Sequence, residues 1–129
     1  MREITTHKVN GCNEALRVTA IDEPGSGGAC HHYSVSGFAA ETNKSLPGSG
    51  ISSLPILFQN GPIPEVGTNG LTHEALLAIV IDRLQGFQKG PYACRENAIA
   101  LTKLEEAVHW LKHRTEQRLA RGVEGTHEK

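Results

Sequence analysis

An excess of positive charge is absent from this sequence, which has 13 lysine and arginine residues against 14 acidic ones and a net charge of −1. The chain therefore has no net electrostatic attraction for a polyanion such as DNA. Long apolar runs are absent too. The N-terminal MREITTHKVN has no signal-peptide core, and the longest aliphatic run, Ala75–Ile81, is too short to span a bilayer. The sequence predicts a soluble, cytoplasmic protein that binds neither nucleic-acid polymers nor membranes.

Cysteine is also scarce. Cys12, Cys30 and Cys94 are odd in number and have no paired spacing, which indicates reduced thiols rather than a disulfide framework. A chain of 129 residues is long enough for one domain but short for two independent ones. We expect a single fold unit with a β-rich part over 1–70, a helical hairpin over 71–126 and a tail over 127–129.

Catalytic and metal-binding signatures are missing. The sequence has no glycine-rich phosphate loop, no paired carboxylates at a credible active site and no Ser-His-Asp order. Cys94 has no local signature of a catalytic thiol. His109 and His113, one helical turn apart, lack a third metal ligand at an expected spacing. We therefore expect no catalytic residue, no metal and no cofactor, and we predict that the protein is not an enzyme.

The first seventy residues, which hold most of the glycines and prolines, have the pattern of strands and turns. Apolar and polar residues alternate in Leu16–Ala20 and again in His32–Ser36, so each run can place one face on a core. The glycine-rich stretch between them predicts a hairpin loop, and Leu54–Phe58 predicts a third strand. We expect the next segment to be extended because of Pro62 and Pro64. These patterns favour a small antiparallel β-sheet.

Helical patterns follow. Thr72 is a plausible N-cap, and Ala75–Leu84 is apolar on nearly every face, as expected for a helix buried between a sheet and another helix. This helix should end near Gly86. A second helix is predicted from about Tyr92–Ala120, with Gly122 as its stop. Its apolar seam is Leu101, Leu104, Val108 and Leu111. The whole chain is therefore predicted to be α+β, a small N-terminal antiparallel sheet followed by a C-terminal antiparallel helical hairpin.

The predicted turn between the two helices, GFQKGPYACREN, gathers residues that suit a nucleotide. The aromatic faces of Phe87 and Tyr92 can stack on a base. The amide of Asn97 can donate to and accept from a base or ribose edge, and Lys89 and Arg95 suit phosphate. Alternatively, Phe87 belongs to the core and Arg95 is a solvated charge.

Arginines recur near the end of the second helix. Arg114, Arg118 and Arg121 are spaced by 4 and 3 residues and so share a face, where they can clamp a pyrophosphate with charge-assisted hydrogen bonds. The alternative is that they form ordinary salt bridges to Glu116 or Glu124.

Helix geometry relates these two clusters. Asn97 and Arg114 should lie roughly 25 Å apart along one helix, too far to share a small ligand within one chain. If two copies of the helix pair antiparallel about a two-fold axis centred between Glu105 and Glu106, Asn97 meets Arg114 of the partner subunit. Two identical composite pockets would result, provided that both clusters serve one ligand.

The segment Arg83–Thr126, about a third of the chain, resembles the phage anti-Thoeris sponge proteins, which sequester glyco-cyclic ADP-ribose. This hairpin also resembles the shorter phage anti-CBASS cyclic oligonucleotide sponges. The preceding Phe58–Gly70, FQNGPIPEVGTNG, is similar to the anti-Thoeris branch alone. The resemblance implies a sheet joined to a helical hairpin and assembly into homodimers or homohexamers. It also implies that the protein acts in the cytoplasm of the infected bacterial host, where it would capture the signal without degrading it.

The resemblance also implies roles for individual residues. Phe87 would stack on the adenine, Asn97 would hold the nucleotide by hydrogen bonds, and Arg114 with Arg118 would contact the pyrophosphate. The other candidate ligand-binding residues around this site are Gln88, Tyr92 and Arg95.

Certain hexameric relatives bind cyclic trinucleotides at a second site, so cyclic dinucleotides or trinucleotides are further candidate ligands. The corresponding residues are Arg121, Gly122, Val123, Glu124, Gly125 and Thr126. Alternatively, this segment only caps the helix. Two rival functions stay open: an enzyme that hydrolyses the cyclic nucleotide signal, and a regulator whose arginine-rich helix binds nucleic acid.

Overall fold

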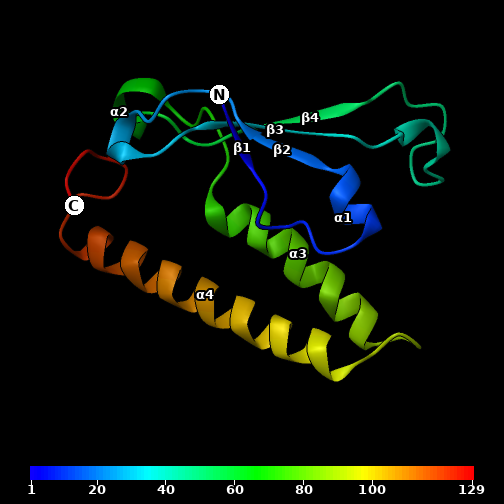
Figure 1. Cartoon of the computed structure of the whole chain (residues 1–129). Helices are drawn as coiled ribbons and strands as arrows, with labels where there is room; N and C mark the ends of the chain where they lie inside the picture. The colour runs from blue at the N-terminus through cyan, green and yellow to red at the C-terminus, as the bar shows by residue number, and fades with distance from the viewer. The chain divides into compact units, whose positions relative to one another are not determined.

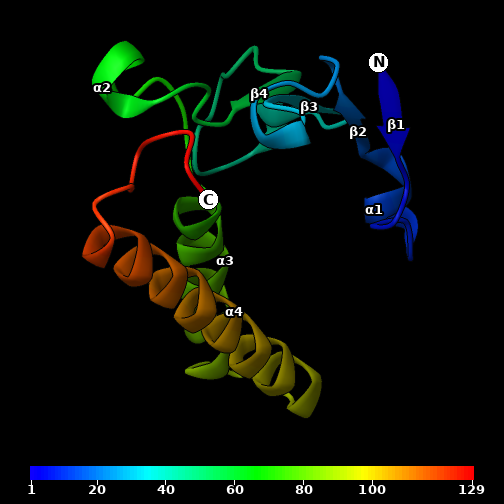
Figure 2. The same cartoon turned by 90° about the vertical axis from the view of Figure 1, so that its left-hand side faces the viewer.

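The computed structural model describes residues 1–129 and divides into two compact units. The sheet unit consists of Met1–Asn60 with Thr68–Gly70, and the hairpin unit consists of Gly61–Gly67 with Leu71–Lys129. Strands occupy the first half of the chain, and the two long helices occupy the second (Figures 1 and 2). The single fold unit expected from the chain length stays a prediction.

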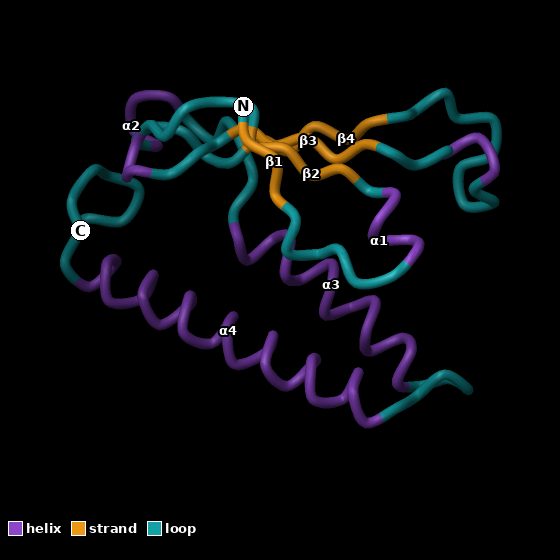
Figure 3. Tube along the Cα trace, in the orientation of Figure 1, coloured by secondary structure: helices purple, strands orange, loops and turns teal.

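The sheet unit contains a four-stranded antiparallel sheet in the order β1-β2-β3-β4 (Figure 3). The strands are β1 (Arg2–Ile4), β2 (Arg17–Ala20), β3 (His32–Ser36) and β4 (Ser53–Leu57). Their register brings Ile4, Val18, Val35 and Leu54 side by side across all four strands. Ala20, only 1% exposed, pairs with Tyr33 on the same face. The alternation in the sequence therefore gives the sheet one apolar face, as expected.

Short helices and turns connect the strands. α1 (Gly11–Ala15) precedes β2, the 3-10 helix η1 (Ser26–Gly28) lies between β2 and β3, and the 3-10 helix η2 (Ala40–Thr42) lies between β3 and β4. Near the end of the unit, Asn60 N–H donates to Asn69 Oδ1 at 2.9 Å, and Asn69 Nδ2 donates to Asn60 O at 2.8 Å. These two bonds close the base of the loop over residues 61–67.

The loop over residues 61–67 is not extended. It forms α2 (Ile63–Val66), with Pro62 as N-cap residue and Pro64 in the first turn. The expected extended path is therefore wrong at this point, because a proline in the first helical turn loses no hydrogen bond and its fixed φ suits a helix. Gly67, with φ of 69°, ends the helix.

The helical hairpin consists of α3 (His73–Gln88) and α4 (Arg95–Ala120), which pack against each other (Figure 1). Thr72 Oγ1 accepts from Ala75 N–H at 3.1 Å, so the predicted cap of α3 is confirmed. α3 continues past Gly86, and α4 begins three residues after Tyr92, with Cys94 as its N-cap. The half-buried positions of α4 include the whole predicted seam, Leu101, Leu104, Val108 and Leu111. The predicted fold class is confirmed.

α3 differs from expectation in its burial. No residue of α3 is buried within the chain, and Ile79 is 66% exposed. The predicted burial on most faces is therefore wrong for the single chain, because one packed helix covers only one side of α3. Large apolar side chains of both helices, such as Val80 and Trp110, are exposed as well. None of the helices has the length and apolarity needed to cross a membrane.

Candidate functional site

The turn between α3 and α4 is braced by one side chain. Gln88 Nε2 donates to Cys94 O, and Cys94 N–H donates to Gln88 Oε1, both at 3.2 Å. The amide of Gln88 therefore satisfies the backbone of Cys94, the residue that starts α4. A ligand contact by Gln88 stays a prediction, and its amide supports the turn that carries the other candidate residues.

A cavity of about 280 Å³ opens beside this turn. Its lining residues are Arg83, Gly86, Phe87, Gly90, Pro91 and Tyr92. Phe87 is half-buried, whereas Tyr92 is 76% exposed at the rim. Complete small-molecule sites typically occupy about 300–1,000 Å³. At about 280 Å³, the cavity lies at the lower end of this range.

Arg83 is a lining residue that the sequence reasoning missed. Its guanidinium carbon lies 5.0 Å from the centre of the Phe87 ring, a cation–π arrangement. Arg83 takes part in none of the chain's ion pairs. The signal was present in the sequence, since residues four apart on a helix are neighbours. The cation covers one face of Phe87, and both residues line the same cavity.

Asn97 lies in the first turn of α4, five residues after Tyr92, which lines the cavity. Its backbone N–H donates to Cys94 Sγ at 3.4 Å. Its side-chain amide makes no hydrogen bond within the chain, and the residue is half-buried on the seam side of the helix. Arg95 beside it is exposed and unpaired. Both side chains are therefore available to an outside partner.

The arginines near the end of α4 differ from one another. Arg114 and Arg121 are exposed and take part in no ion pair, whereas Arg118 is only 6% exposed. Arg118 Nε donates to Glu124 Oε2 at 2.9 Å, and the same two atoms form a salt bridge. The alternative interpretation, a salt bridge to Glu124, thus holds for one of the three arginines.

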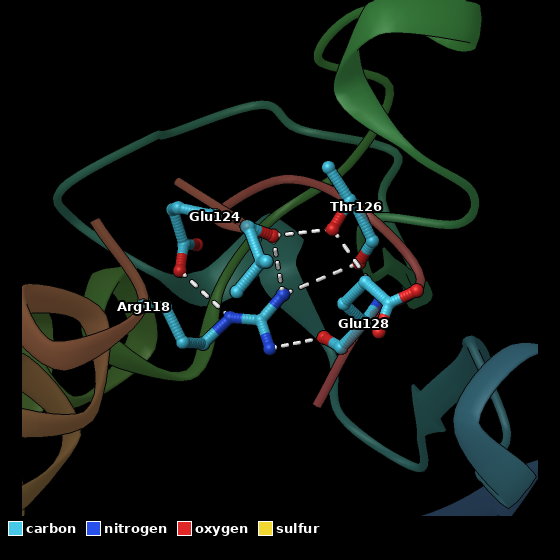
Figure 4. Close-up of polar contacts among 5 residues, drawn as sticks. Arg118, Glu124, Thr126 and Glu128 are labelled. Carbon is cyan, nitrogen blue, oxygen red and sulfur yellow. Dashed lines mark hydrogen bonds and ion pairs between the residues drawn. The ribbon is translucent and has the colours of Figure 1, made fainter. Parts of the chain in front are cut away.

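The remaining donors of Arg118 are directed at backbone carbonyls of the following loop (Figure 4). Nη2 donates to Val123 O at 2.8 Å and to Thr126 O at 3.2 Å, and Nη1 donates to Glu128 O. Gly122, with φ of 72°, turns the chain back over the helix end. The segment Arg121–Thr126 is therefore both the predicted helix cap and a folded loop.

Histidines on α4 do not form a metal centre. The rings of His109 and His113 lie edge-on to Trp110, with centroid distances of 5.6 and 5.7 Å. No group of three or more histidine, cysteine, aspartate or glutamate side chains in the chain could hold a metal ion. The three cysteines are free thiols.

One carboxylate in the sheet unit has a shifted pKa. Partial desolvation raises the pKa of Asp22, but the backbone N–H groups of His31 and His32 donate to its carboxylate at 3.1–3.2 Å, and these hydrogen bonds, together with the nearby His31, lower the pKa by more. The net pKa lies below the usual value for aspartate. This carboxylate closes the β2–β3 connection and has a structural role.

Comparison with known proteins adds independent information. Residues 52–116, half of the chain, match the family described as Acb2/Tad1, hairpin domain. The chain is also 61% identical over 72 residues to a protein of Bacillus phage SBSphiJ7 named Thoeris anti-defense 1. The aligned part is 56% of this chain and 51% of that protein, so the chain spans about half the length of this curated relative. The family match includes the α3–α4 turn and Arg114 but ends before Arg118.

Proposed function

Because the chain belongs to the Acb2/Tad1 hairpin family, we propose that it is a phage protein that counters host defence by sequestering a small cyclic nucleotide signal without degrading it. The proposed ligands are isomers of glyco-cyclic ADP-ribose, and the name of the phage relative supports the anti-Thoeris branch. The observation that carries the proposal is the α3–α4 turn, where Phe87 and Arg83 line a cavity of about 280 Å³.

In this proposal each end of α4 supplies part of the site. Phe87 stacks on the adenine, Asn97 holds the nucleotide with its unpaired amide, and Arg114 meets the pyrophosphate with its unpaired guanidinium. Tyr92 lies at the exposed rim, and Arg95, exposed three residues further along the chain, is a further candidate contact. Nanomolar sequestration requires about 12 kcal/mol of binding free energy, of which one stacked base supplies about 1–3 kcal/mol. Several such contacts, drawn from both ends of the helix, are therefore needed.

The pocket is proposed to be shared between two copies of the chain. Asn97 and Arg114 lie about 25 Å apart along an uninterrupted α4, so one subunit cannot bring both to one ligand. An antiparallel pair of α4 helices would do so. Exposed Ala100 and Ala107 lie seven residues apart beside the seam, where their small side chains allow a second helix to approach closely. A homodimer is the smallest assembly with complete pockets, and a hexamer would contain three such pairs.

A second ligand class is proposed for the C-terminal loop. Cyclic dinucleotides or trinucleotides would bind at Arg121–Thr126, where the sequence resembles the second site of hexameric relatives. Their binding should not compete with cyclic ADP-ribose, because the residues proposed for the two sites do not overlap.

A panel of cyclic nucleotides tests the main proposal. The purified chain is mixed with cyclic ADP-ribose isomers, glyco-cyclic ADP-ribose and cyclic oligonucleotides, and depletion from solution is followed by chromatography before and after heat denaturation. A sponge depletes its ligand in proportion to protein and returns it with unchanged mass. Turnover of excess ligand into a product of different mass would instead establish the hydrolase.

Two controls complete the test. Asn97→Ala should lose depletion while its circular dichroism spectrum and elution volume stay unchanged, because its side chain has no partner within the chain. Light scattering at the working concentration should show an assembly of two or more chains. A monomer that binds the ligand at full strength would contradict the composite pocket.

Binding that favours long nucleic acids and weakens steeply with salt would instead support the rival function, a regulator that binds nucleic acid.

A further inference from the structure

Arg118 is the only buried charged residue of the chain, and its surroundings explain why. Its Nε, Nη1 and Nη2 atoms donate four hydrogen bonds, every one to residues between Val123 and Glu128 (Figure 4). A guanidinium has five N–H donors. The chain itself therefore satisfies nearly the whole hydrogen-bonding capacity of Arg118, and it also supplies the compensating negative charge through Glu124.

This arrangement conflicts with a direct phosphate contact. A buried charge is stable only while it is paired and hydrogen-bonded, so a phosphate could reach Arg118 only by displacing Glu124 and the loop carbonyls together. Arg114 meets no such obstacle, because it is exposed and unpaired. Arg121 follows seven residues later, close to the same side of the helix as Arg114, and it is exposed too.

We propose that Arg118 is a positioning residue: it holds the loop Gly122–Glu128 folded over the end of α4 and does not itself bind the ligand phosphate. The part of this inference that concerns the ligand rests on the proposed function, whereas the part that concerns the loop does not. At this end of α4, the pyrophosphate of the ligand then binds to Arg114.

The loop that Arg118 holds also contacts α2. Ile63 N–H donates to Gly125 O at 2.8 Å. A Cβ atom at Gly125 would lie 3.4 Å from Ile63 Cβ, so the two segments touch closely. Arg118, the loop and α2 thus form one connected contact set within the hairpin unit. Loss of the Arg118 hydrogen bonds should therefore reduce the protection of the Ile63 amide, although the two residues are far apart in the sequence.

Hydrogen exchange on the full-length chain tests the loop. Arg118→Gln and Glu124→Gln should each speed exchange at the amides of Ile63, Val123 and Thr126 by about tenfold or more, and the double variant should add little, because both act on one clamp. Lys112→Gln removes an exposed charge from the same helix and should leave these amides unchanged. Unchanged protection in Arg118→Gln would overturn the proposal. Should Arg118→Gln fail to fold, Glu124→Gln, which keeps the arginine, still decides this point.

Calorimetry with cyclic ADP-ribose tests the ligand. If Arg118 acts only through the loop, Arg118→Gln and Glu124→Gln should change the dissociation constant equally, within about twofold, whereas Arg114→Gln should raise it by about tenfold or more. A loss in Arg118→Gln that exceeds the loss in Glu124→Gln by tenfold would show a direct contact and overturn the inference. If the wild-type chain binds none of the cyclic nucleotides, the proposed function fails, and hydrogen exchange alone decides the role of Arg118.

Discussion

The polar side chains at the two ends of α4 differ in their hydrogen-bond partners. Near its start, the amide of Asn97 is half-buried and has no partner within the chain, while Gln88 takes over the bonds that the turn requires. Near its end, Arg118 is saturated by a loop that folds back over it, while Arg114 one turn earlier stays exposed. At each end, therefore, one residue secures the structure and another is left for a ligand.

The largest effect is expected at Phe87, in the last turn of α3 before the turn that leads into α4. Phe87→Ala should weaken cyclic ADP-ribose binding by about 10- to 100-fold, because stacking of a base on an aromatic ring contributes about 1–3 kcal/mol. Phe87→Tyr keeps a ring and should keep most of the affinity. Calorimetry measures both variants. Equal losses in the two variants would show that ring stacking is not the interaction.

The next effect concerns Gln88 and distinguishes its support of the α3–α4 turn from a contact with the ligand. Gln88→Ala removes both hydrogen bonds to Cys94 and should lower the free energy of unfolding by about 1–3 kcal/mol, as measured by urea denaturation. Gln88→Glu keeps an acceptor for Cys94 N–H but loses the donor, so it should lie between the wild type and Gln88→Ala. A variant that unfolds normally but fails to bind would make Gln88 a ligand contact instead.

A smaller effect is expected at Arg83. Arg83→Gln removes the cation above Phe87 and should weaken cyclic ADP-ribose binding by about two- to fivefold, because an exposed cation–π contact contributes about 0.5–1 kcal/mol. Arg83→Lys should restore part of the affinity. Titration at low and high salt distinguishes this role from phosphate binding. A loss that grows strongly at low salt would place Arg83 on the phosphate.

The smallest effect lies outside both ends, at Asp22. The pKa of Asp22 is lowered in the folded chain, so its contribution to stability is present above the unfolded value of about 3.9 and is lost as the pH falls through the lower folded value. The melting temperature of the wild type should therefore fall more between pH 5 and pH 3 than that of Asp22→Asn. Parallel curves for the two proteins would show that the carboxylate charge contributes nothing.

Much of the fold could be predicted because it follows from periodicity. The alternation in Leu16–Ala20 and His32–Ser36 and the seam of α4 depend on local spacing, which the sequence displays directly. β1 was missed because Arg2–Ile4 is too short to show an alternating pattern. α2 was missed because proline suits both an extended segment and a first helical turn.

The site was less predictable than the fold. Arg114 and Arg118 are the same residue type one turn apart, and nothing in their spacing shows that one is exposed and the other buried. That difference depends on Gly122 and on the loop carbonyls of Val123 and Thr126, which are backbone groups brought together only by folding. The stacking of Arg83 on Phe87 could have been predicted from their spacing.

The closed base of the 61–67 loop affects how proteolysis should act on this chain. The polypeptide passes from one unit to the other after Asn60, again after Gly67 and a third time after Gly70. Hydrogen bonds between Asn60 and Asn69 join the chain segments that enter and leave the 61–67 loop. A single protease cut inside α2 would break the only covalent path between residues 1–60 and the α3–α4 hairpin. The hydrogen bonds of Asn69 to Asn60 would still tie residues 68–70, which continue into α3, to the sheet unit, so the two fragments should stay together until denaturant is added.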